Sequence, residues 1–334
     1  MASLEIFIVT HKRPQFLKRT IDSVKVALNA AQVNAHIEIL LNGPDDSSRE
    51  WLVAESNAST NVTLSFTQSS KTLGPSSARN AVAKTIKAEN ALFLDDDCTL
   101  PSHFFRAWVD FCEHHREWHV IGGPNLTPPN SAAIERQSGA VLGHPFASLN
   151  SSWRYRENNR VFLCSDIEIT STHLFVKKAV LEKVMFPVEF QTAEENAFLN
   201  NVQKAGFQQI WYCGQIFVWH ERRPTIIQFA WQIFRYGRGR GQMVRDGFSF
   251  KWFHLVPALA VAFFAGSLAW PDSAFQFFYQ IAAGVYCAAL IVASIQVAAW
   301  LGPLLFFILH VSYIMGWWAG LLLRSSPNTE STLS

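Results

Sequence analysis

Cysteine is scarce in this sequence, and neither sign of charge is in excess. The five cysteines are scattered, odd in number and without metal-ligand spacing. This pattern argues against a disulfide framework or a zinc site and favours a reducing compartment. The formal net charge is only +2 over 334 residues. Overall electrostatics therefore indicate no nucleic-acid partner.

Charged side chains are missing from two long stretches near the end of the chain. No Asp, Glu, Lys or Arg occurs from Phe253 to Pro271 or from Ser273 to Leu323. Three segments there are long enough to span a bilayer at about 1.5 Å per residue. These candidate spans are Trp252–Trp270, Gln276–Leu301 and Pro303–Leu323. A buried helical core is the alternative, but two charge-free runs of this length are unusual in a soluble domain.

The flanks of the candidate spans predict an orientation. Basic residues precede the first span, Arg238, Arg240 and Arg245 among them, and only Asp272 follows it. This asymmetry predicts that the preceding domain faces the cytoplasm, with these arginines as a basic collar beside the membrane. The N-terminus shows no signal-peptide pattern, which agrees. We expect a multi-pass protein of the cytoplasmic membrane, with an outer C-terminus if all three segments span.

The first part of the chain alternates between strand and helix patterns. The predicted buried strands are Leu4–Thr10, His36–Leu41, Val62–Phe66 and Ala91–Leu94. Helical spacing of apolar residues begins at Pro14 and again at Gly74. The order strand, helix, strand, strand, helix, strand predicts an α/β domain with a mostly parallel sheet covered by helices. In such sheets, ligands bind beyond the carboxyl ends of the strands.

The middle of the chain is less regular. A helix is predicted over Phe104–Trp118, a strand over Ile167–Leu174 and a short helix over Lys178–Val184. Residues Ser131–Asn159 are polar and carry several arginines without a clear period, so we expect an irregular segment. It is either a solvated surface loop or a loop that faces an acceptor, and the residues leave both open.

Three adjacent carboxylates, Asp95, Asp96 and Asp97, end the strand that begins at Ala91. Like charges repel, so folding alone gives no reason to place them together. A divalent cation gives one, because Mg²⁺ binds carboxylate oxygens together with substrate phosphates. Alternation along an extended backbone places Asp95 and Asp97 on one side and Asp96 on the other. A solvated acidic turn is the alternative.

Three motifs in this region resemble the inverting family 2 glycosyltransferases, which have a nucleotide-sugar-binding GT-A domain. Residues 10–14, Thr-His-Lys-Arg-Pro, are similar to the family's Thr-Tyr-Asn-Arg-Pro after the first strand. Residues 74–80, Gly-Pro-Ser-Ser-Ala-Arg-Asn, resemble its Gly-x-x-x-Ala-Arg-Asn. Residues 41–45 lie where the family has Asp-Asn-Gly-Ser, but Leu41 replaces the acidic residue. The resemblance runs from about Leu4 to about Arg245.

The resemblance implies a donor site with a bound Mg²⁺ or Mn²⁺. The donor-binding residues it implies are Thr10, Asn42, Arg79, Asp95, Asp96 and Arg235. Asp97 is the metal ligand, with Asp95 beside it, and His220 stands where many relatives carry a His that reaches the metal or diphosphate. A single His is more often structural, so both interpretations of His220 stay open.

A second acidic pair, Glu194 and Glu195, begins a predicted helix that runs from Thr192 to Gly206. Acids in a first helical turn stabilise it through the macrodipole and need no catalytic role. In family 2 enzymes, however, the second acid of a pair at this position is the general base. The resemblance therefore implies that Glu195 is the base, with Glu in place of the usual Asp.

A third segment, residues 232–236, Gln-Ile-Phe-Arg-Tyr, resembles the Gln-x-x-Arg-Trp signature of some relatives. By that resemblance Arg235 contacts the diphosphate, and Gln232 and Tyr236 contact the acceptor.

These expectations divide the chain into four parts: a GT-A domain over 1–225, a basic juxtamembrane segment over 226–251, two to three transmembrane helices over 252–323 and a polar tail over 324–334. The implied enzyme transfers a sugar from a UDP-, GDP- or dTDP-linked donor to a lipid-linked or cell-surface polysaccharide. Two alternatives are transfer to polyprenyl phosphate and a catalytically inactive GT-A subunit of a polysaccharide assembly complex.

Overall fold

The computed structural model describes residues 3–56, 62–190, 192–248, 252–270 and 274–323, in two compact units. The first unit comprises Met1–Asn130 and Asn150–Glu221, and the second Ser131–Leu149 and Arg222–Ser334. The predicted polar tail 324–334, Asp272 and residues 249–251 of the juxtamembrane segment lie outside the described residues.

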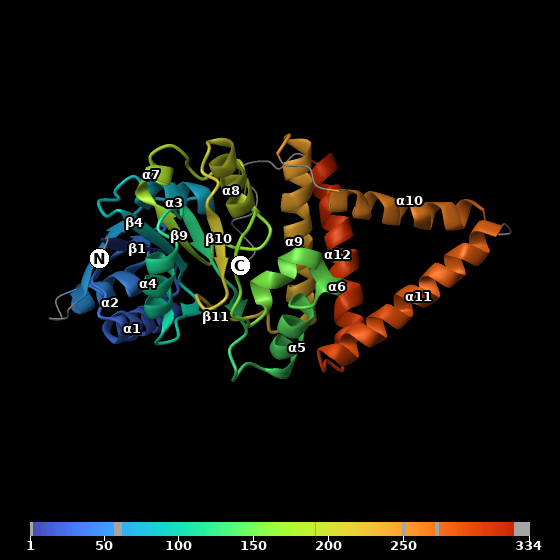
Figure 1. The fold of residues 1–334 in the computed structure, drawn as a ribbon, viewed down its shortest axis with the longest axis horizontal. Helices are drawn as coiled ribbons and strands as arrows, with labels where there is room; N and C mark the ends of the chain where they lie inside the picture. Colours follow the sequence, from blue (N-terminus) through green and yellow to red (C-terminus); the bar gives the residue numbers. More distant parts are fainter. Residues whose placement is uncertain (1–2, 57–61, 191, 249–251, 271–273, 324–334) are drawn as a thin grey trace. The chain divides into compact units, whose positions relative to one another are not determined.

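An eight-stranded sheet forms the centre of the first unit, in the order β3-β2-β1-β4-β9-β6-β10-β8 (Figure 1). Its strands are β1 (Leu4–Thr10), β2 (Ala35–Leu41), β3 (Thr63–Gln68), β4 (Asn90–Asp95), β6 (Val120–Gly122), β8 (Val161–Leu163), β9 (His173–Lys177) and β10 (Ile210–Cys213). The first four strands are parallel, as are β6 and β10, whereas β9 and β8 run antiparallel to their neighbours. A small second sheet contains β5 (Cys98–Thr99), β11 (Val218–His220) and β7 (Asn125–Leu126). The predicted α/β class with a mostly parallel sheet is confirmed.

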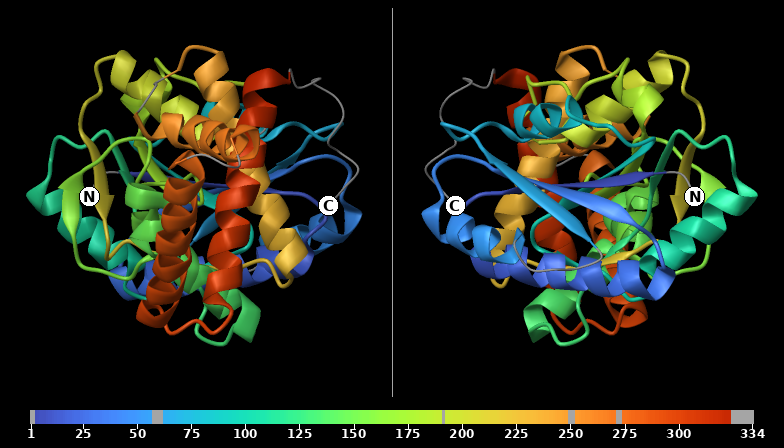
Figure 2. Two further views of the ribbon diagram at one scale, coloured as in Figure 1. Left: turned by 90° about the vertical axis from the view of Figure 1, so that its right-hand side faces the viewer. Right: turned by 90° about the vertical axis from the view of Figure 1, so that its left-hand side faces the viewer.

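Helices cover both faces of the large sheet (Figure 2). The helices of this unit are α1 (Pro14–Ala31), α2 (Asp46–Ser56), α3 (Pro75–Ala83), α4 (Phe104–His114), α7 (Lys178–Leu181) and α8 (Glu194–Lys204), with the 3₁₀ helix η1 running over Leu149–Tyr155. Successive side chains of a strand point to opposite faces. Ile6 and Ile8 therefore pack with α1 and α4, while Phe7 packs with α3 and α8.

Helix α2 was missing from the sequence-based order, which placed two strands in succession there. That part of the prediction is wrong, because parallel neighbours such as β2 and β3 need a crossover connection. The Asp45 carboxylate begins the helix by accepting a hydrogen bond from the Ser48 backbone N–H at 3.1 Å. Only Ser48 and Leu52 of the helix are buried, so its apolar pattern is weak.

The polar segment Ser131–Asn159 is not irregular, contrary to the prediction. It forms α5 (Ala133–Leu142), α6 (Pro145–Ser148) and η1. The Glu135 carboxylate accepts a hydrogen bond from the Ala132 N–H at 2.8 Å, which satisfies a backbone donor at the start of α5. Pro145 is the first residue of α6, a position that proline favours because its fixed φ is already helical.

The strand predicted over Ile167–Leu174 begins only at His173. The preceding residues turn, because the Glu168 carboxylate accepts hydrogen bonds from the N–H and hydroxyl of Ser165, at 2.9 and 2.8 Å. Local side-chain bonds of this kind compete with strand pairing.

The second unit contains α5 and α6 together with the C-terminal helices α9 (Ile226–Arg245), α10 (Val256–Ala269), α11 (Ala274–Gln296) and α12 (Gly302–Leu322), and the 3₁₀ helix η2 (Trp252–Leu255). By length and composition, α11 and α12 are each able to cross a membrane. The predicted first span, Trp252–Trp270, contains η2 and α10, and α10 alone rises only about 21 Å over its 14 residues. The hydrocarbon core of a bilayer is about 30 Å thick.

Candidate active site

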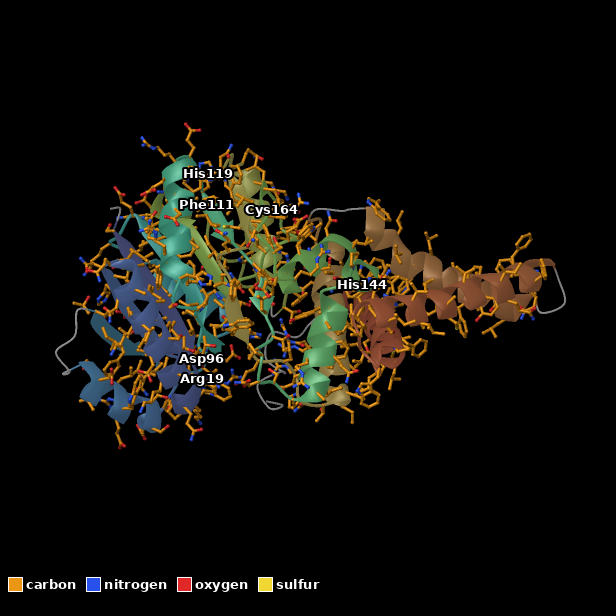
Figure 3. The ribbon with its side chains drawn as sticks, turned by 60° about the horizontal axis from the view of Figure 1, so that its bottom comes forward. Arg19, Asp96, Phe111, His119, His144 and Cys164 are labelled. Carbon is orange, nitrogen blue, oxygen red and sulfur yellow. The ribbon has the colours of Figure 1, made fainter. Side chains whose placement is uncertain are left out.

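Asp96 connects the carboxyl ends of β1 and β4. Its Oδ2 accepts a hydrogen bond from the Thr10 hydroxyl at 2.6 Å, and its backbone carbonyl lies 2.7 Å from the Thr20 hydroxyl of α1. Figure 3 labels Asp96 at this end of the sheet. Burial raises the pKa of Asp96 to about 6, although the Thr10 hydrogen bond works in the opposite direction. These contacts fix the position of Asp96 at the start of the acidic turn.

Arg79 joins the two acidic motifs that the sequence places far apart. Its Nη2 lies 3.1 Å from Asp95 Oδ1, and its Nη1 lies 2.8 Å from Glu194 Oε1. Burial and the neighbouring Glu195 carboxylate raise the pKa of Glu194 to about 7, whereas Arg79 lowers it. Helix α3 therefore brings the end of β4 and the start of α8 to one place through a single guanidinium group.

Glu195 occupies a different environment from Glu194. Its Oε1 lies 3.5 Å from Nη1 of Arg154, and its side chain is 13% exposed. Among the described residues, Arg154 is its ion-pair partner. The residue before the pair, Ala193, has a φ of 63°, a left-handed conformation that is unfavourable for a residue with a Cβ. Such strain is maintained only by surrounding structure, and it fixes where α8 begins.

Arg154 is held by several contacts at once. Its Nη2 donates to the Asp166 carbonyl oxygen at 2.9 Å, and its Nε donates to the carbonyl oxygen of Ile167. The Asn196 side chain donates to the same Asp166 carbonyl. A buried guanidinium that is fixed by two backbone carbonyls presents its remaining N–H groups in a defined direction, which here is toward Glu195.

The donor set around Asp97 fits a divalent metal ion. Asp97 Oδ1 lies 3.2 Å from His220 Nε2, and ligand atoms of Asp97, Cys98 and His220 all lie within 4.8 Å of one another. The Asp97 side chain is 22% exposed, so an ion has access to it. Carboxylate oxygen suits Mg²⁺ and Mn²⁺, and imidazole is a common additional ligand. Cys98 is fully buried, with its Sγ 4.0 Å from the Thr172 carbonyl oxygen.

Asp97 and His220 carry further signs of a binding function. The Asp97 carboxylate raises the pKa of Asp95, in addition to the larger effect of burial, while Arg79 lowers it. Arg13, 46% exposed, lies 3.4 Å from Asp97 and 3.5 Å from Asp96. The His220 Nδ1 atom is buried without a hydrogen-bond partner among the described residues.

The chain matches the family model "Glycosyl transferase family 2" over residues 5–185, which is more than half of its length. It belongs to glycosyl transferase family 2. No curated protein matches the sequence.

Solved structures share the fold at low sequence identity. The mannosyltransferase PcManGT from Pyrobaculum calidifontis is 12% identical with a TM-score of 0.65, and the match covers 96% of this chain and 87% of that one. The TarS fragment 1–349 from S. aureus, solved with UDP, is 13% identical with a TM-score of 0.52, covering 96% and 90%. The same fragment with UDP-GlcNAc is 12% identical with a TM-score of 0.51, covering 96% and 90%. These likenesses establish the fold alone.

One departure from the family 2 motifs has a local explanation. Leu41, in place of the usual acid, is fully buried in the core beside β1. The Asn42 side chain exchanges two hydrogen bonds with the Leu73 backbone, at 2.7 and 3.0 Å, and so fixes the loop before α3. Asp45 accepts hydrogen bonds from the backbone N–H groups of Ser48 and Lys12. Burial alone would raise the pKa of Asp45, but the hydrogen bonds outweigh this effect and lower it.

The remaining family 2 motif lies in the second unit. Gln232, Arg235 and Tyr236 are on α9, at the i, i+3 and i+4 spacing that places side chains on one side of a helix. Tyr236 is 40% exposed. The carboxylates, Arg79 and His220 all belong to the first unit, where the structure brings them together. Gln232, Arg235 and Tyr236 belong to the second unit.

Sequence reasoning missed two arginines of this site. Arg13 is part of the first family 2 motif, and its position directly before Pro14 at the start of α1 was an available signal. Arg154 had no such signal, because Arg136 and Arg156 occur in the same polar segment and Arg160 directly follows it. Only the fold selects Arg154 as the partner of Glu195.

Proposed function

We propose that this chain is a membrane-anchored, inverting glycosyltransferase that moves a sugar from a nucleotide-sugar donor to an acceptor hydroxyl. The observation that carries the proposal is the Arg79 link between Asp95 and Glu194, in a chain of this family. The similar structures were solved with GDP-Man and Mn²⁺ or with UDP and UDP-GlcNAc, which supports a nucleotide-sugar donor. UDP-, GDP- and dTDP-linked sugars all remain candidate donors.

Asp97 and His220 would hold a Mg²⁺ or Mn²⁺ ion, with Asp95 beside it. When bound, the ion neutralises the charge that develops on the departing diphosphate. Arg13 lies at the exposed side of Asp97, where its guanidinium is available to a donor phosphate. Asp96 keeps this turn in place through Thr10, while Arg79 orients Asp95 toward the sugar or ribose.

Glu195 acts as the general base. An acceptor hydroxyl is a poor nucleophile near neutral pH, so a positioned carboxylate must take its proton as it attacks. The acceptor oxygen forms a bond to the anomeric carbon while the bond from that carbon to the diphosphate oxygen breaks. The proton goes to Glu195, and the electron pair leaves with the nucleoside diphosphate. A single displacement inverts the anomeric centre.

The acceptor is proposed to be a lipid-linked or cell-surface polysaccharide, because α11 and α12 are apolar enough for a membrane environment. The catalytic domain, proposed as residues 1–225, would face the cytoplasm, with a multi-pass region over 252–323 behind the basic segment 226–251. Gln232 and Tyr236 would contact the acceptor and Arg235 the diphosphate. Leu41, and Glu195 in place of the usual Asp, favour an inactive subunit, whereas the intact run Asp95–Asp97 favours catalysis.

Donor binding tests the proposal. The purified full chain is dialysed against a panel of UDP-, GDP- and dTDP-sugars, with Mn²⁺ and with a chelator. We expect at least one donor to bind and its affinity to fall when the metal is removed. A folded protein that binds none of them would overturn the assignment.

Arg154 is proposed as a positioning residue for Glu195. Arg154→Ala removes its fixed contact, so kcat should fall on the order of 10²-fold, the cost of a small misplacement at a reacting group. The donor KM should change little, because the polar contacts of Arg154 among the described residues are with the base and with the segment Asp166–Ile167. Arg154→Lys keeps the charge and should recover part of the rate, as should added guanidine with Arg154→Ala.

The neighbouring Arg156 provides a matched control, since its guanidinium lies 4.0 Å from the centre of the Trp153 ring. Arg156→Ala should keep normal kcat. Equal loss in both alanine variants, or a loss at Arg154 that neither Lys nor guanidine relieves, would reduce Arg154 to a purely structural residue.

A further inference from the structure

Helices α9 and α12 touch through their backbones. A Cβ added at Gly237 would lie 2.2 Å from the Tyr313 carbonyl oxygen, and one at Gly241 would lie 2.0 Å from that of Trp317. From the other side, Gly316 and Gly320 of α12 are equally close to the carbonyl oxygens of α9, at 2.0 and 1.9 Å. Two Gly-x-x-x-Gly pairs therefore face each other, an arrangement that allows close helix approach.

The two helices run parallel, and the arginines of α9 therefore lie beside α12. The partner of Gly316 is the Phe234 carbonyl, and the partner of Gly320 is the Arg238 carbonyl, so both numbers increase together. At the end of the pair, Arg245 Nη1 donates to the carbonyl oxygens of Gly320 and Leu323, at 3.0 and 2.7 Å. This guanidinium caps the C-terminus of α12.

This pairing conflicts with a membrane-spanning α12. Gly237 packs against Tyr313, close to the middle of α12, and Arg235 and Arg238 flank Gly237 in the sequence. If α12 crossed a bilayer, these arginines would lie near its centre, where a charged side chain is strongly unfavourable. The length and apolar composition of α12 therefore do not decide its position.

The first half of α12 also has polar neighbours. The Leu301 N–H donates to the Gln137 side chain of α5 at 2.7 Å. His310 Nε2 lies 2.9 Å from the Phe146 carbonyl oxygen of α6, so its N–H has a backbone acceptor there. Helices α5 and α6 come from the segment between β7 and β8, and α5 carries the charged residues Glu135 and Arg136. The start and the first half of α12 are thus hydrogen-bonded to α5 and α6, and its second half packs against α9.

Helices α10 and α11 differ from α12, because neither packs against α9 as α12 does. Only 17% of the α11 span is buried, and large apolar side chains are exposed along it, Phe277, Phe278 and Ile295 among them. Helix α10 with η2 reaches about 29 Å, the thickness of a bilayer core. Trp252 and Trp270, 69% and 62% exposed, mark its two ends, as tryptophan does at membrane interfaces.

We propose that α10 and α11 form the membrane-inserted hairpin, and that α12 lies at the membrane surface beside α9. The partner of the exposed faces of α10 and α11 is the lipid bilayer. The hairpin returns the chain to its starting side, so the C-terminus is on the same side as the catalytic domain. This proposal rests on the proposed membrane anchoring and changes its topology, because three spans would place the C-terminus on the opposite side.

Fusions to the full chain in a bacterial host test this topology. Green fluorescent protein, which fluoresces only when it folds in the cytoplasm, is fused before Met1 or after Ser334. Alkaline phosphatase, active only outside, is fused after Ser334 or inserted at Asp272. We expect both fluorescent fusions to fluoresce, the phosphatase at Asp272 to be active and the phosphatase after Ser334 to be inactive.

Active phosphatase after Ser334 with a dark fluorescent fusion there would show that α12 spans, and would overturn the proposal. Inactive phosphatase at Asp272 would show that α10 and α11 do not form a hairpin through the membrane, and would likewise overturn the proposal. Recovery of the full chain in the soluble fraction would show that α10 and α11 are not inserted in a membrane, and would also overturn the proposal. The readouts report location and not sugar transfer, so failure of the enzymatic assignment would leave their interpretation unchanged.

Discussion

Replacing Glu195 with Gln is expected to lower kcat by roughly 10²–10⁴-fold, the usual cost of losing a general base. Gln keeps the size and hydrogen-bonding capacity of Glu but does not accept the proton of the acceptor. Donor binding should stay close to normal, because the donor contacts proposed above come from the turn after β4 and from Arg13, Arg79 and Arg235, and not from Glu195. Rapid-quench or coupled assays of nucleoside diphosphate release measure kcat, and dialysis measures donor affinity.

Glu194→Gln is the matched control, since it makes the same chemical change one residue earlier. Glu194 contacts Arg79 at 2.8 Å, so this variant should weaken the link to Asp95 and affect donor binding more than the chemical step. Glu195→Asp restores the residue usual in the family and should retain part of the rate. Wild-type turnover by Glu195→Gln, or inactivity confined to Glu194→Gln, would move the base to another residue.

Asp97→Ala is expected to abolish metal-dependent donor binding and, with it, activity. Asp97 lies 3.2 Å from His220, and its side chain is partly exposed. Its removal relieves repulsion with Asp95, so the fold should be at least as stable, and a thermal midpoint that does not fall will check this. Donor affinity is measured with Mn²⁺ and with a chelator.

Asp110→Ala serves as the control for Asp97. Asp110 is an exposed acid on α4 that pairs with Arg106 at 3.0 Å, so its loss changes the net charge equally without touching the site. It should bind donor like the wild type. If Asp97→Ala binds donor with unchanged affinity and the chelator has no effect on either protein, the metal assignment is wrong.

The sequence was sufficient to predict a mostly parallel sheet and to place the acidic turn at the end of a strand. Ile6, Phe7 and Ile8 are consecutive apolar residues whose side chains point alternately to the two faces of β1. They therefore specify which helices each face contacts, and this pattern is local. The position of Asp95 at a strand end follows from the same pattern. Helix α2 was missed because little of it is buried, so its residues carry no strong period.

Contacts between distant segments were beyond sequence reasoning. Arg154 resembles its neighbours Arg156 and Arg160 until the fold places it beside Glu195. The close packing of α9 on α12 depends on glycines far apart in the chain, whereas hydropathy alone made α12 a membrane span. The predicted first span is divided into the 3₁₀ turn Trp252–Leu255 and helix α10, a division that its apolar composition does not indicate.

Donor turnover by the full chain in native membranes tests the central claim most directly. Purified protein and membranes are incubated with each nucleotide sugar and Mn²⁺, and nucleoside diphosphate release is followed for wild type, Glu195→Gln and Asp97→Ala. The account predicts release from at least one donor by the wild type, abolished by chelator and by both substitutions. No release from any donor, or equal release by all three proteins, would contradict it.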